Sequence, residues 1–124
     1  MDTTTRELSP GKTFLKTTPA LFIAIDVADD SNILGKLRTA DIIVIAKHSI
    51  DEGKAALESS SFPVTVIRCS KMSEEILGFI GFIKTSGILT SVILNVESGS
   101  VEDAVHAMKC GASDFLIGDC YDAR

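Results

Sequence analysis

Few side chains in this sequence are placed so that they could act together in a chemical step. Cys69 and Asp26 each end a short apolar run, and Arg68 precedes the cysteine. A neighbouring arginine can lower the pKa of a thiol, which would suit Cys69 to redox sensing, whereas a cysteine buried among apolar groups is inert. Both interpretations stay open at this point. No nucleophile occurs with a base and a group to orient that base, so we expect no enzymatic activity.

The sequence also predicts no metal site and no other cofactor. Its three cysteines, Cys69, Cys110 and Cys120, have neither the spacing of a metal site nor an even number for pairing. One thiolate and one carboxylate would hold Mg²⁺ poorly, because this ion prefers oxygen ligands. An odd cysteine count without a signal peptide is typical of the reducing cytoplasm, where we expect the protein to be found.

Apolar runs that alternate with capped helical segments must position these residues. Continuous apolar runs predict buried strands, and serines followed by acidic residues predict helix starts. The helix at 73–87 has a core stripe of Ile76, Phe79, Ile80 and Ile83, and the stripe Val101, Ala104, Val105 and Met108 predicts a buried face on the helix that Ser100 opens. We predict strands at 20–26, 41–46, 63–69, 91–96 and 114–118, and helices at 29–37, 49–60, 73–87 and between Ser100 and Gly111.

This alternation predicts a three-layer α/β/α sandwich with a five-stranded parallel sheet. In such sheets ligands and partners meet the carboxyl ends of the strands, which places Asp26, Cys69, Val96 and Gly118 near the working edge. We expect residues 1–19 to form a flexible arm and residues 20–124 a single domain. Only Asp119 and the residues CYDAR follow the last predicted strand, so a helix after it would be shortened or missing.

Composition excludes several classes of function. The chain of 124 residues has a formal net charge of −5, and its basic residues are scattered, which argues against a nucleic-acid surface. Its longest apolar run, ALFIAI, is far shorter than a membrane-spanning helix of about 20 residues. We therefore expect partners that are proteins, and neither nucleic acid nor a membrane.

Three stretches resemble the receiver domain of two-component response regulators, the CheY-like superfamily. The stretch SVILNVESGSVEDAVHAMKCGASDFL (91–116) is similar to the family's fourth strand, the following loop and helix, and the aromatic fifth strand. VTVIRCSKM (64–72) and LFIAID (21–26) resemble its third and first strands. The resemblance implies a flavodoxin-like sheet with strand order 2-1-3-4-5, and a family activity in which one aspartate accepts a phosphoryl group.

The resemblance also implies that the phosphoacceptor chemistry is gone. The family's acidic pair falls on Asp26 and Val27, and its acceptor aspartate falls on Cys69. Its hydroxyl residue falls on Val96 and its lysine on Gly118, so one carboxylate remains of five chemical groups. A domain of this kind is similar to the pseudo-receivers, which act by binding proteins.

Two surfaces are candidates for such binding. The family resemblance points to the segment from Val101 to Ile117, including Val105, with Phe115 at the family's aromatic switch position. The helix at 73–87 has Gly78 and Gly81 opposite its core stripe and Phe82 on the flank; the bare glycines could admit a neighbouring helix, or could simply face solvent.

The function predicted from sequence is therefore a phosphorylation-independent interaction module in bacterial two-component-type signalling. Its expected partners are other signalling or regulatory proteins, and a homodimer is a further expectation. Two alternatives remain: a phosphoacceptor regulator with an atypical site, and a thiol-based sensor that uses Cys69.

Overall fold

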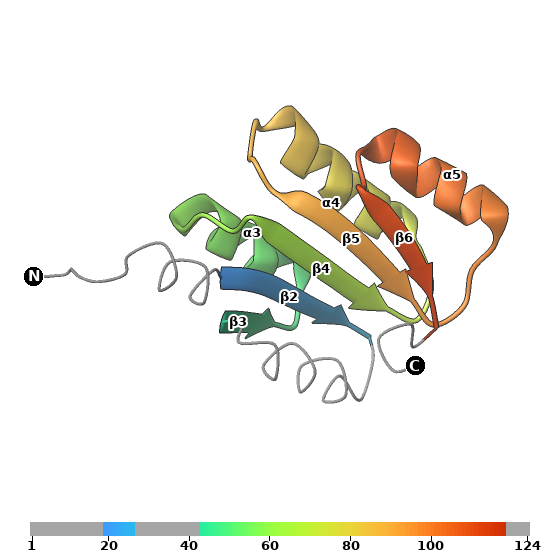
Figure 1. Ribbon diagram of the computed structural model, residues 1–124, viewed down its shortest axis with the longest axis horizontal. Coiled ribbons are helices and arrows are strands. Elements are labelled where there is room, and N and C mark those ends of the chain that lie inside the picture. Colours follow the sequence, from blue (N-terminus) through green and yellow to red (C-terminus); the bar gives the residue numbers. More distant parts are fainter. Residues whose placement is uncertain (1–18, 27–42, 119–124) are drawn as a thin grey trace, which may run out of the picture.

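Parallel strands form a single sheet in the computed structural model, which describes residues 19–26 and 43–118 (Figure 1). The order of the strands in the sheet is β3-β2-β4-β5-β6, and every neighbouring pair is parallel. Counted along the chain this is the order 2-1-3-4-5, so the predicted α/β fold is confirmed. The strands are β2 (Pro19–Ile25), β3 (Ile43–Lys47), β4 (Val64–Cys69), β5 (Ser91–Val96) and β6 (Asp114–Ile117).

A serine caps the amino end of each described helix, as the sequence predicts. The helices are α3 (Ile50–Ser59), α4 (Glu74–Thr85) and α5 (Val101–Cys110). The hydroxyl oxygens of Ser49, Ser73 and Ser100 accept hydrogen bonds from backbone N–H groups of the first turns. At Ser100 a capping box is complete, because the carboxylate of Asp103 accepts a bond from the Ser100 N–H at 3.0 Å.

The main core lies between the sheet and these helices. The predicted stripe of α4 is confirmed, since Ile76, Phe79, Ile80 and Ile83 are all buried. A second, smaller cluster on the other face of the sheet contains Phe22, Ala24 and Val66. Because side chains alternate along a strand, β2 and β4 each contribute to both clusters.

The predicted buried stripe of α5 is wrong. Val101 is 80% exposed, and Val105 and Met108 are each 46% exposed, whereas Ala107 is fully buried. The helix is turned so that its small side chains, Ala107 with the partly buried Ala104, face the molecule. Its larger apolar side chains consequently remain on the surface.

Several predictions fall outside the described residues. These are the helix at 29–37, nearly all of the arm at 1–19, whose last residue Pro19 begins β2, and the end of the chain after Gly118. Among the described helices, none combines the length and the apolar character that a membrane span requires.

Candidate functional site

Cys69 is the last residue of β4 and is completely buried. Burial raises the pKa of its thiol to about 12, and the carboxylate of Asp26 acts in the same direction; Arg68 lowers the pKa, and Glu97 raises it by less than Arg68 lowers it. Loss of water disfavours a charged sulfur more than the single guanidinium favours it. The thiol is therefore protonated at neutral pH, which is the inert alternative and argues against redox sensing.

Asp26 closes the end of β2 and is held by a specific bond. Its backbone has a φ of 52°, a left-handed conformation that aspartate tolerates better than most residues. Its Oδ1 atom accepts a hydrogen bond from the backbone N–H of Ser70 at 3.0 Å. The carboxylate thus ties the loop after β4 to the end of β2.

Val96 and Gly118 end the next two strands and complete this edge of the sheet. Val96 is fully buried and pairs with Cys69 on one side and Ile117 on the other. The N–H of Gly118 donates to the carbonyl of Val96 at 2.7 Å, and its φ of 78° is a conformation that favours glycine over a lysine. Asp26, Cys69 and Val96 therefore lie at the ends of three adjacent strands, β2, β4 and β5, and Gly118 follows the fourth strand, β6. Val27 lies outside the described residues.

These side chains do not fit the magnesium ion that receiver domains use. Asp26 supplies one carboxylate, already bonded to Ser70, and Cys69 supplies a protonated thiol. Mg²⁺ needs hard oxygen ligands in octahedral geometry. No group of three or more potential metal ligands occurs within residues 19–26 and 43–118.

A buried polar network on the opposite face of the sheet was not foreseen from the sequence. The Nη1 atom of Arg68 donates to Oδ1 of Asn95 at 2.6 Å, and both residues are buried. The Nδ2 atom of Asn95 donates to the carbonyl oxygens of Leu116 and Gly118, at 3.1 and 2.9 Å. Glu97 lies 3.7 Å from Nη2 of the same arginine, and Nε has no hydrogen-bond partner.

This network links three strands, because Arg68 is on β4, Asn95 on β5 and Leu116 on β6. Arg68 and Asn95 are direct partners in the register of β4 and β5. The sequence carries one signal of this network: Arg68 and Asn95 each interrupt an apolar strand one residue before its end. To predict that the two residues pair, one must know the register between β4 and β5, which a single sequence does not supply.

Exposed apolar side chains gather on the outer parts of α5 and β6. We call this set the α5–β6 surface: Val101, Val105, Met108 and Ile117, all at least 45% exposed. Phe115 is half-buried against the main core, and a Cβ atom on Gly99 would come within 3.2 Å of its ring. The ring therefore packs inward beneath the start of α5 and is not part of the exposed set.

The glycine face of α4 is open, as expected. A Cβ atom added at Gly78 or at Gly81 would meet no other atom within 4 Å. Phe82, on the flank, is half-buried, and the ammonium of Lys54 lies 4.9 Å from the centroid of its ring. Phe82 is thus already covered in part by α3, which leaves the two glycines as the bare surface of this helix.

The geometry can be compared with known proteins. No protein-family model matches the chain, and no curated protein sequence matches it. Solved structures do match. The receiver domain of NtrC4 from Aquifex aeolicus is 26% identical, with a TM-score of 0.68 over 80% of this chain and 82% of that one.

The chain has the receiver fold. A response regulator receiver protein from Pseudomonas putida is 24% identical, with a TM-score of 0.67 over 80% of this chain and 84% of that chain. An atypical orphan response regulator, described as having a phosphorylation-independent regulatory mechanism, is 17% identical, with a TM-score of 0.65 over 78% of this chain and 80% of its own. At identities below 25%, these two likenesses concern the fold alone.

Proposed function

We propose that the protein is a receiver-like interaction module of two-component-type regulation that works without accepting a phosphoryl group. The observation that carries this proposal is Cys69, a fully buried thiol at the end of β4, where the family resemblance puts the acceptor aspartate. A buried protonated thiol is a poor nucleophile toward a phosphoryl donor. It also cannot hold the metal ion that would neutralise the transferred group.

The neighbouring positions support the same proposal. The family resemblance puts Val96 where a hydroxyl would contact the phosphoryl oxygens, and Gly118 where a lysine would balance their charge. The carboxylates of Asp26 and Glu97 both raise the pKa of Cys69, which means that both contribute negative potential at this edge. Such a potential disfavours an incoming phosphate group.

The α5–β6 surface is the proposed contact region for a partner protein. Apolar side chains gathered on a surface commonly mark an interaction site. The surface can be presented permanently, because Phe115 already packs inward and requires no phosphoryl group to place it.

An amide NMR titration tests the proposal directly. The ¹⁵N-labelled protein is titrated with Mg²⁺ and beryllofluoride, which mimics a phosphoryl group on a carboxylate. We expect no saturable shift at the amides of Asp26, Cys69 or Gly118. Saturable shifts at these amides would favour the alternative, a phosphoacceptor regulator with an atypical site, and would end the proposal.

A further inference from the structure

The outer edge of β3 is unpaired in the part of the chain that the structure describes. Among the strands of residues 19–26 and 43–118, β3 pairs with β2 alone and is the last strand on its side of the sheet (Figure 1). A free edge offers its N–H and C=O groups to any further strand, and proteins usually protect such edges with charges, prolines or a covering element. In β3 the sole charged residue is Lys47, at the carboxyl end, while Ile43 and Ile45 are 46% and 39% exposed.

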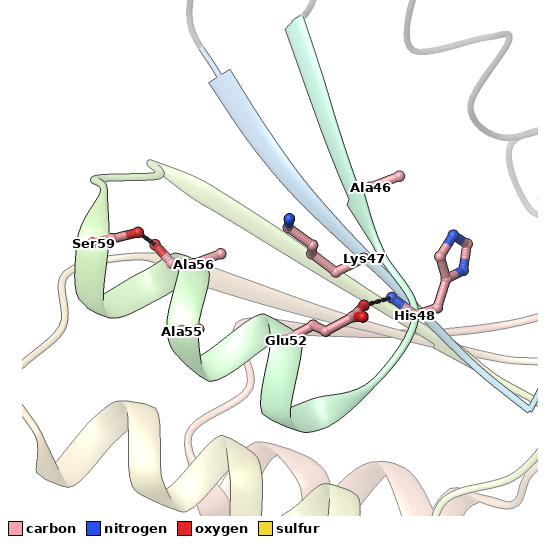
Figure 2. A pocket seen from close by; sticks show the side chains of 7 residues that line it. All are labelled: Ala46, Lys47, His48, Glu52, Ala55, Ala56 and Ser59. Atoms are coloured by element: carbon pink, nitrogen blue, oxygen red, sulfur yellow. Dashed lines mark hydrogen bonds between the residues drawn. The ribbon is translucent and has the colours of Figure 1, made fainter.

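A hollow of about 480 Å³ lies along this edge. Figure 2 shows it between the end of β3, where Lys47 points toward α3 and Ala46 points away, and one face of α3. Apart from Glu52, that face carries small side chains at helical spacing, so it leaves room beside the strand. The residues from α3 are Glu52, Ala55, Ala56 and Ser59.

The exposed isoleucines and the hollow lie on the same face of the sheet. Ile45 is the register partner of Leu21, which belongs to the main core beneath the helices. Because alternate residues of a strand share a face, Ile43, Ile45 and Lys47 all lie on the α3 side. Among the described residues, the edge thus combines unpaired backbone and exposed apolar side chains with a hollow beside the carboxyl end of the strand.

We propose that this edge pairs with the same edge of a second copy of the chain. A two-fold axis perpendicular to the sheet at Ile45 would make the two β3 strands antiparallel, continuing the sheet from one copy into the other. Ile45 of each copy would then face the other, and Ile43 of the other copy would lie beside the hollow. Each Ile43 would face the aliphatic stem of Lys47 from the other copy.

Charge favours a second copy as the occupant. α3 runs back along β3, with Ser59 far from His48 in Figure 2, so an antiparallel neighbour would bring its Lys47 toward the carboxyl end of α3. This end carries Glu58 and no basic residue in its last turn. A cation there is favourable because the helix dipole is negative at its carboxyl end. The same edge, formed by β3 and α3, therefore supplies both halves of the contact, as an isologous dimer requires.

The test is the molar mass of the full chain in solution, measured by light scattering after size exclusion and by sedimentation equilibrium over a range of concentrations. The monomer is 13.2 kDa, and we expect a concentration-dependent approach to twice this mass. Ile45→Lys places charges opposite one another at the two-fold axis and should return the protein to monomer. Leu89→Lys, at a loop residue that is 91% exposed, is the matched control and should keep the parent's mass.

Circular dichroism and amide spectra establish that each variant is folded, and Ile43→Lys provides a second variant of the edge. In the dimer, the outward amides of β3 should also exchange with deuterium more slowly than in Ile45→Lys. A parent that stays monomeric at every concentration overturns the proposal. So does a dimer that survives both edge variants but is lost in Val105→Lys, a result that would point to the α5–β6 surface. None of these outcomes bears on the beryllofluoride titration, so the two proposals fail separately.

Discussion

At the scale of single residues, the reactivity of the Cys69 thiol distinguishes an inert buried cysteine from a redox sensor. In a variant carrying Cys110→Ser and Cys120→Ser, we expect Cys69 to react with a soluble disulfide reagent far more slowly in the native state than in denaturant. The reason is its complete burial together with a pKa raised to about 12. Native labelling as fast as that of the denatured chain would contradict this.

The same raised pKa makes stability depend on pH in a defined window. The folded-state pKa lies above 9.0, the ordinary value for a thiol, so above pH 9.0 the unfolded chain binds fewer protons at this position than the folded chain. The contribution of Cys69 to the free energy of unfolding is therefore fully present below about pH 9 and is lost as the pH rises toward 12. Urea unfolding of the parent and of Cys69→Ala at pH 8 and 10.5 measures it, and we expect the parent to lose more stability between the two values.

The buried pair of Arg68 and Asn95 gives a third prediction at this scale, about the free energy of unfolding. Asn95→Ala removes the acceptor at 2.6 Å and leaves a buried guanidinium with only the distant Glu97, so we expect a loss of about 3 kcal/mol in the free energy of unfolding. Arg68→Met combined with Asn95→Leu should recover part of that loss, because two apolar side chains need no partners. Urea denaturation of the three proteins is the measurement. A double variant less stable than Asn95→Ala would show that the network is not the cause.

At the scale of elements, the bare face of α4 gives a prediction about the stability of the monomer. Gly78→Ala and Gly81→Ala each add a Cβ atom that meets nothing within 4 Å, so helix propensity alone should stabilise the monomer by about 1 kcal/mol per site. Thermal unfolding of a dilute sample measures this. Gly111→Ala is the contrasting control and should destabilise, because Gly111 has a φ of 124° and lies against Lys84.

The elements also show which parts of the fold are readable from sequence. Strand β2 is buried on both faces and appears as a continuous apolar run, whereas the buried strand β4 is interrupted by Thr65 and Arg68. Serine caps mark the starts of α3, α4 and α5. The rotation of α5 about its axis was predicted wrongly because an alanine can pack closer to the sheet than a valine. Packing depth of this kind is set by the neighbouring elements and leaves no periodic signal in one sequence.

The site was less predictable than the fold. The positions of Asp26, Cys69 and Val96 on neighbouring strand ends follow from strand boundaries and sheet order. The pairing of Arg68 with Asn95, by contrast, depends on the register between β4 and β5. That register is decided by the whole core and becomes visible only when the strands are assembled.

At the scale of the whole molecule, the α5–β6 surface can be changed without harming the fold. Val105→Glu with Met108→Glu alters side chains that are each 46% exposed, so we expect a change in unfolding free energy of about 0.5 kcal/mol or less per site. Binding of an apolar fluorescent dye should fall in this variant relative to the parent. A large loss of stability would show instead that these side chains are part of the core.

The all-parallel sheet has a consequence for how the protein is made. A tight hairpin cannot join two neighbouring parallel strands. In this sheet β2 lies between β3 and β4, and both of these strands follow β2 in the chain. During synthesis the apolar segment Pro19–Ile25 leaves the ribosome well before β4 can cover it. Non-local pairing of this kind slows folding and leaves apolar surface open to aggregation. We therefore expect the nascent chain to be a better chaperone client than its modest size suggests.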